Sequence, residues 1–162
     1  MLGAAEALWK KKQHQPALAS LDVLLAKEAT SADCRVEAKL LKSAILRDTG
    51  SASGALVQVE EALDIAKSYD ELYNLCGKAQ FHRGVCLFEL ARFEEARWAL
   101  NFASKAAGCE KQVQLWKELT ATVLQDSGTD SNTWYRAMSR EDPAGRFPTA
   151  PTRLNRQPIR RR

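Results

Sequence analysis

The stretch KAQFHRGVCLFELARFEEARWALNFASKAAG, residues 78–108, decides the fold of this chain. Its apolar residues recur every three or four positions on both sides of a corner at residues 91–92, and Gly108 ends the run as a C-terminal glycine does. This pattern predicts two antiparallel helices joined by a tight corner. The positions that carry it are Gly84, Leu87, Phe93, Ala96, Leu100 and Ala103.

This order of small, bulky and aromatic residues resembles a tetratricopeptide repeat. Such a unit cannot bury its apolar face alone, so further copies are expected, and two weaker ones lie upstream. Their corner alanines are Ala17 and Ala55. The spacing is 38 residues from Ala17 to Ala55 and 41 from Ala55 to Ala96, which exceeds the usual ~34 and indicates short insertions. The first copy holds Ala5, Leu8, His14, Ala17 and Leu21, and the second holds Ser43, Leu46, Ala55, Val59 and Ala62.

The N-terminal part of the chain predicts four helices. The first covers residues 2–13, and Pro16 opens the second, since proline is favoured in a first helical turn. The third follows a cap-like cluster at residues 30–33 and stops at Gly50. A flexible SASG corner at residues 51–54 leads into the fourth.

The fifth helix is expected to begin near Asp70 and the seventh to cover residues 110–125. We therefore predict an all-α fold over residues 1–125, a right-handed superhelix of three antiparallel helix pairs with the seventh helix capping its open end. Residues 126–162 read as a disordered tail rich in proline and arginine. The apolar stripe expected on the seventh helix is Val113, Trp116, Leu119 or Thr120, and Val123.

The composition is ordinary for one globular domain, with 45% hydrophobic and 27% charged residues. The four cysteines form no CxxC pair and only two histidines are present, so we expect no metal site, no redox motif and no cofactor. We see no signal peptide and no run of about 18 apolar residues, so no membrane span is expected. A reducing compartment, the cytoplasm or the nucleus, is the expected location.

Positive charge concentrates at the C-terminal end. Residues 128–162 hold eight arginines and three acidic residues, whereas residues 1–127 carry a net charge near zero. One interpretation is a solvated tail. The alternative function for the chain is electrostatic binding of nucleic acid or an anionic membrane by this tail, positioned by the repeats. The basic residues concerned are Arg153, Arg156, Arg160, Arg161 and Arg162.

A closer likeness covers residues 78–100, KAQFHRGVCLFELARFEEARWAL, and residues 109–119, CEKQVQLWKEL. These segments resemble the third repeat and the capping helix of the fungal Sgt-one cochaperones, the suppressor-of-G-two-allele-of-Skp family. In that family a CS domain and an SGS region follow the repeats, and neither is present in this sequence. The resemblance therefore implies only the repeat module's role: association with protein partners, including ubiquitin-ligase or chaperone machinery, and self-association.

No Ser/His/Asp or Cys/His order, phosphate-binding loop or HExxH motif is present, so we expect a non-catalytic scaffold or adaptor without a small-molecule substrate. Partners would bind the concave face, which the first helix of each pair should line. The expected groove residues are Leu2, Trp9, Leu40, Ala44, Arg47, Phe81, Val85 and Phe88. An open alternative is that Phe81 and Phe88 pack on a neighbouring helix instead.

Many repeat domains of this superfamily grip the acidic C-terminal peptide of heat-shock chaperones with a basic clamp. The five clamp positions hold Leu2, Glu6, Leu41, Lys78 and His82, of which only Lys78 fits. Because Glu6 would repel a carboxylate, the sequence argues against that peptide as the ligand.

Overall fold

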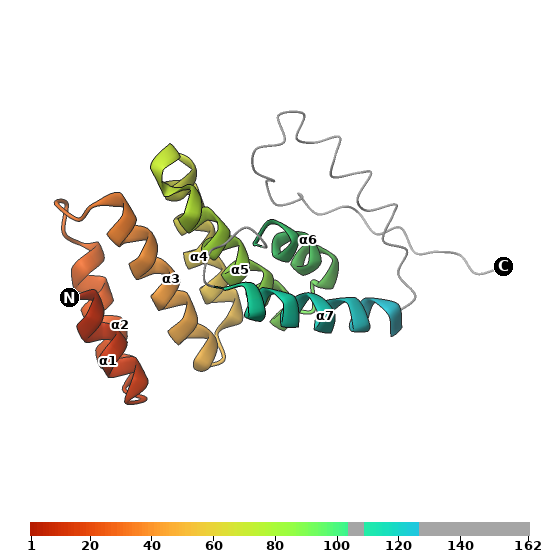
Figure 1. Cartoon of the computed structure of the whole chain (residues 1–162). Helices are drawn as coiled ribbons and strands as arrows, with labels where there is room; N and C mark the ends of the chain where they lie inside the picture. Colours follow the sequence, from red (N-terminus) through yellow and green to blue (C-terminus); the bar gives the residue numbers. More distant parts are fainter. Residues whose placement is uncertain (104–108, 127–162) are drawn as a thin grey trace. The chain divides into compact units, whose positions relative to one another are not determined.

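The structure, a computed structural model, describes residues 1–103 and 109–126 (Figure 1). This part of the chain contains seven α-helices, one short 3₁₀-helix and no strand, so the all-α prediction is confirmed here. The expectations for Gly108, for residues 127–162 and for the five arginines named among them lie outside the described residues. The helices are α1 (Leu2–Lys10), α2 (His14–Leu25), α3 (Ala32–Asp48), α4 (Ala52–Lys67), η1 (Asp70–Leu72), α5 (Tyr73–Glu89), α6 (Phe93–Ala103) and α7 (Glu110–Asp126).

Consecutive helices pack on one another from α1 to α7 (Figure 1). The three expected pairs are present as α1 with α2, α3 with α4, and α5 with α6. In addition, the odd-numbered helices contact one another in series, α1 with α3, α3 with α5, and α5 with α7. The first helices of the pairs therefore form one continuous layer. The tetratricopeptide superhelix as such stays a prediction.

The corners inside the three pairs share one backbone geometry. Each has a single residue with positive φ: Lys12 at 61°, Gly50 at 82° and Ala91 at 57°. The next residue then donates its N–H to the carbonyl oxygen five residues earlier, which is the Schellman arrangement that ends many helices. These bonds join Gln13 to Leu8 at 3.0 Å, Ser51 to Leu46 at 2.8 Å and Arg92 to Leu87 at 2.8 Å.

This repeated corner coincides with the register taken from the sequence. The acceptors Leu8, Leu46 and Leu87 are the bulky positions of the three copies, and a buried alanine follows each left-handed residue by five positions. Each alanine lies in the first turn of the second helix of its pair, where it is fully buried. The three pairs are thus built alike around their corners. The alanines are Ala17, Ala55 and Ala96.

Gly84 of α5 lies at a close contact with α6. A Cβ atom placed on Gly84 would come within 2.6 Å of Leu100 Cγ and 3.3 Å of the Ala96 carbonyl oxygen. Leu100 and Ala103, from the same side of α6, have no exposed surface. The small residue at position 84 is therefore required by a close helix contact.

Several helix ends differ from the sequence prediction. α1 ends at Lys10 rather than at residue 13, and α2 begins at His14, so Pro16 is its third residue. Proline is tolerated there because the first N–H groups of a helix have no intrahelical acceptor. α4 begins at Ala52, so the SASG segment is mostly helical and the corner lies at residues 49–51. α7 extends to Asp126, one residue beyond the expected end.

The buried side of α7 also differs in part from the predicted stripe. Val113 and Thr120 are buried as expected, together with Leu124, whereas Leu119 is 43% exposed. At about 100° per residue, Val113, Thr120 and Leu124 lie on one side of the helix. Leu119 lies off that side, so the stripe runs through Thr120 instead.

Candidate partner-binding face

Three of the eight expected groove residues are buried in the core. Leu40 is 5% exposed, Ala44 7% and Val85 1%. The reason is that α3 contacts α1, α2, α4 and α5, while α5 contacts α3, α4, α6 and α7, so the middle helices have little free circumference. These three side chains cannot contact a partner in this conformation, which corrects their assignment to the groove surface.

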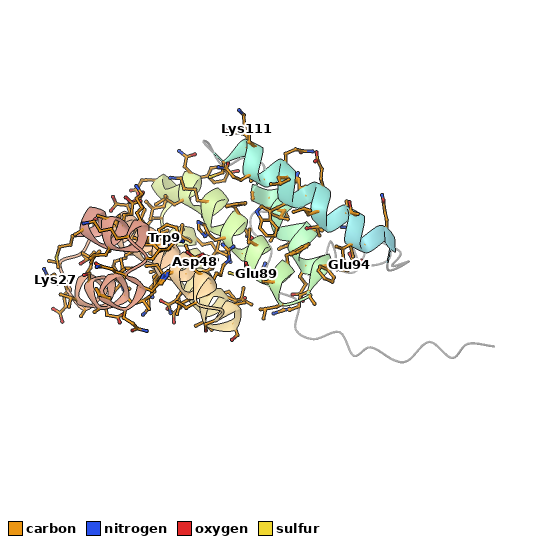
Figure 2. All side chains as sticks on the ribbon, turned by 90° about the horizontal axis from the view of Figure 1, so that it is seen from below. Trp9, Lys27, Asp48, Glu89, Glu94 and Lys111 are labelled. Atoms are coloured by element: carbon orange, nitrogen blue, oxygen red, sulfur yellow. The ribbon has the colours of Figure 1, made fainter. Side chains whose placement is uncertain are left out.

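The two groove residues of α1 are half-buried against the first core cluster. Leu2 and Trp9 pack there beside Ala5, Leu21 and other buried residues. The indole N–H of Trp9 donates to Asp48 Oδ2 at 2.7 Å, which ties the end of α1 to the end of α3 (Figure 2). The polar atom of Trp9 is thus already bonded within the chain.

Arg47 of α3 forms an ion pair with Glu89 of α5. Its Nη2 lies 2.9 Å from Glu89 Oε1 and its Nε donates to the same oxygen at 3.0 Å. Both side chains are partly exposed, so this pair contributes less than about 1 kcal/mol to stability. The ion pair with Glu89 neutralises much of the positive charge of Arg47, the cation predicted for the groove.

Phe88 is a packing residue that joins three helices. Its ring makes edge-to-face contacts with Phe93 and with Trp116, each at a centroid distance of 5.2 Å. For Phe88 the structure therefore favours the alternative that the ring packs against neighbouring helices. The contact with Trp116 could not be predicted from periodicity, because it joins the third helix pair to α7.

The remaining open part of the face is on α5. Lys78, Phe81 and His82 are each half-buried, and their spacing of three and four residues places them on one side of the helix. The rings of Phe81 and His82 meet edge to face at 5.6 Å. We refer to Lys78, Phe81 and His82 as the α5 face.

His82 is uncharged at neutral pH. Burial, and then the positive charges of Arg47 and Lys78, lower the pKa of its imidazole to about 4. Its Nδ1 has no hydrogen-bond partner among the described residues. The α5 face therefore combines one aromatic ring, one neutral imidazole whose unpaired Nδ1 is buried, and one cation near Arg47.

Two free cysteines, Cys76 and Cys86, are buried on α5. Burial raises the pKa of the Cys86 thiol to about 12 and also raises that of Cys76, so neither is a thiolate at neutral pH. Residues 1–103 and 109–126 hold no group of three or more histidine, cysteine or acidic side chains placed to bind a metal ion. Within the same ranges, every helix falls short of the length and apolar character that crossing a membrane requires.

Comparisons of the chain with protein-family models, with curated proteins and with solved structures find no match. The repeat class and the likeness to Sgt-one cochaperones therefore rest on the residues that carry them.

Proposed function

We propose that this chain is a non-catalytic scaffold or adaptor of the tetratricopeptide type, which binds a segment of a protein partner on its layer of odd-numbered helices. The observation that carries the proposal is the corner shared by the three pairs, with its positive-φ residue and its bond to Leu8, Leu46 or Leu87. Three like units in series are the basis of repeat arrays, whose extended surfaces bind partners.

The α5 face is the proposed contact site. Phe81 is a half-buried aromatic side chain, the class that most often anchors protein interfaces. Lys78 lies one helical turn from Phe81 and forms no ion pair among the described residues. A fitting partner segment has an apolar side chain next to a carboxylate. The Sgt-one resemblance places such a partner in chaperone or ubiquitin-ligase machinery of the cytoplasm or nucleus.

The test is quantitative affinity purification with the tagged full-length chain. The site variant is Lys78→Glu combined with Phe81→Ala. The matched control carries Lys111→Glu and Val57→Ala, two exposed positions on α7 and α4; Lys111 points outward from its helix in Figure 2. Far-UV circular dichroism and thermal unfolding establish that both variants are folded.

We expect the site variant to lose at least about tenfold in recovery of its specific partners, because truncating an anchor commonly costs 2 kcal/mol or more. The control should recover them as the parent does. A folded site variant that keeps the whole partner set would show that the α5 face is not the contact site.

A further inference from the structure

The imidazole of His82 has one enclosed nitrogen and one open nitrogen. The residue is half-buried, and Nδ1 is enclosed without a hydrogen-bond partner, whereas Nε2 is not among the enclosed polar atoms of the described residues. No hydrogen bond within those residues occupies Nε2. Nε2 is therefore the ring atom that solvent or a bound molecule reaches from the open side of α5.

Two cations act on this imidazole. Lys78 precedes His82 by four residues on α5, so the two side chains are neighbours on the helix surface. Arg47 acts on the ring from α3, and burial together with these two charges keeps the imidazole neutral, with a pKa of about 4. Because Arg47 is already paired with Glu89, the ammonium of Lys78 is the charge that this face offers to a partner.

No carboxylate of the described residues balances these charges at His82, since burial and the two cations account for its lowered pKa. Acidic side chains of α5 and of the helices packed on it have other partners. Those pairs are Glu89 with Arg47, Asp48 of α3 with Trp9, Glu60 of α4 with Arg83, Glu94 and Glu95 of α6 with Arg97 and Arg92, and Glu118 of α7 with Gln114.

We propose that binding of a partner carboxylate at Lys78 is coupled to uptake of a proton from solvent by His82. This coupling rests on the proposed function of the α5 face. The imidazolium donates its Nε2–H to the carboxylate, and Lys78 approaches the same group from the neighbouring turn. The carboxylate thereby balances the charge that burial disfavours in the free chain. The α5 face therefore binds acidic segments more tightly as the pH falls.

The size of the effect follows from the charge of the partner. An opposite charge within about 4–6 Å raises the pKa of a basic group by roughly 1–3. A rise of about two, starting from about 4, leaves His82 largely neutral in the free chain and largely protonated in the complex at pH 5. By linkage, the affinity then increases about tenfold from pH 7 to pH 5. An aspartate side chain with its ordinary pKa of ~3.9 stays charged over this range.

Nuclear magnetic resonance of the histidine rings measures this coupling. The chain has two histidines, and His14 of α2 is an internal control. The full-length chain is titrated with acid alone, with a capped leucine–aspartate dipeptide, and with a capped leucine–asparagine dipeptide that has the same shape without the charge. The ring signals of Phe81 report occupancy of the α5 face. A His82→Gln variant, shown to be folded by circular dichroism, is titrated with the same dipeptides.

We expect the leucine–aspartate dipeptide to raise the pKa of His82 and to bind about tenfold more tightly at pH 5 than at pH 7. The leucine–asparagine dipeptide should do neither, and His14 should titrate alike in all samples. In His82→Gln the affinity for leucine–aspartate should change less than about twofold over this range.

A response at Phe81 with an unchanged pKa of His82 would overturn the coupling and leave the contact site standing. Equal affinities of the parent at pH 7 and pH 5 would have the same meaning. Dipeptides that leave Phe81 and His82 unchanged would also overturn the coupling. In that case partner recovery by the Lys78→Glu, Phe81→Ala variant decides the proposed function separately.

Discussion

A single methyl group added at Gly84 tests the packing of the α5–α6 hairpin. The new Cβ would lie 2.6 Å from Leu100 Cγ and 2.8 Å from Leu100 Cδ2, whereas carbon atoms in contact are normally about 3.5–4.0 Å apart. Leu100 has no exposed surface and so no free space to move into. Overpacking of this kind costs ~1–3 kcal/mol, while alanine gains about 1 kcal/mol over glycine in helix propensity. We expect Gly84→Ala to lower the free energy of unfolding by roughly 1 kcal/mol.

A double-mutant cycle with Leu100→Ala isolates the clash. Leu100→Ala alone should cost ~2–5 kcal/mol through the cavity that it leaves, but it removes both atoms that the new methyl group would strike. In that background Gly84→Ala should be neutral or stabilising, which gives a coupling free energy of about 1–2 kcal/mol. The assay is urea unfolding followed by far-UV circular dichroism, with a two-state check by intrinsic fluorescence.

Gly3→Ala is the matched control, because a Cβ at Gly3 meets nothing within 4 Å and Gly3 is also helical. It should leave the protein as stable as the parent or slightly more so. Additive effects of Gly84→Ala and Leu100→Ala would refute a clash between these residues. So would a Gly84→Ala protein that is stabilised as much as the Gly3→Ala protein. The close contact of Gly84 with Leu100, which supports the alignment of the three helix pairs, would then no longer be supported.

Two further perturbations test the site and the corners. His82 has a folded pKa of about 4 against about 6.5 in an unfolded chain, so the unfolded state binds more protons between these values and stability falls as pH is lowered through them. In urea unfolding, we expect the free energy of unfolding to fall by roughly 2 kcal/mol from pH 7 to pH 5. A His82→Gln variant whose free energy of unfolding falls by the same amount over this pH range would refute this. Ala91→Gly should raise the free energy of unfolding by about 0.5–1 kcal/mol, because Ala91 holds a φ of 57° that strains any residue with a Cβ; a lower thermal midpoint would contradict that reason.

The helix pairs could be predicted from the sequence because local signals fix them. The bulky residue before each corner and the small residue after it recur in all three copies, and the structure uses both. The corner residues themselves gave a weaker signal. Only Gly50 is a glycine, whereas Lys12 and Ala91 adopt the same left-handed conformation without that advantage. Helix ends were accordingly misplaced by up to three residues. α1 ends before the expected residue 13, and the starts of α2 and α4 lie before Pro16 and inside the SASG segment.

The open face could not be predicted from periodicity, since a repeat pattern shows that a side is apolar but not which neighbour covers it. Val85 illustrates this, because α3 and α4 of the preceding pair and also α7 pack on α5. Arg83 shows the converse. A charged residue in this position suggests solvent, yet the side chain is 2% exposed, with its guanidinium 5.9 Å from the centre of the Trp98 ring and 3.8 Å from Glu60. Its neighbours come from two different helices, so no local pattern announces them.

The bonds between helix ends support placing the proposed contact on the α5 face rather than on the rest of the odd-numbered layer. Trp9 is bonded to Asp48 and Arg47 to Glu89, so α1, α3 and α5 are held to one another at their C-terminal ends. A partner that needed Trp9 or Arg47 would have to break a bond already made. At Lys78 and His82 no such exchange is needed, and the surrounding helices are held in place before binding. Preorganisation of this kind lowers the ordering cost of association, which is why we place the contact on α5 rather than along the whole layer.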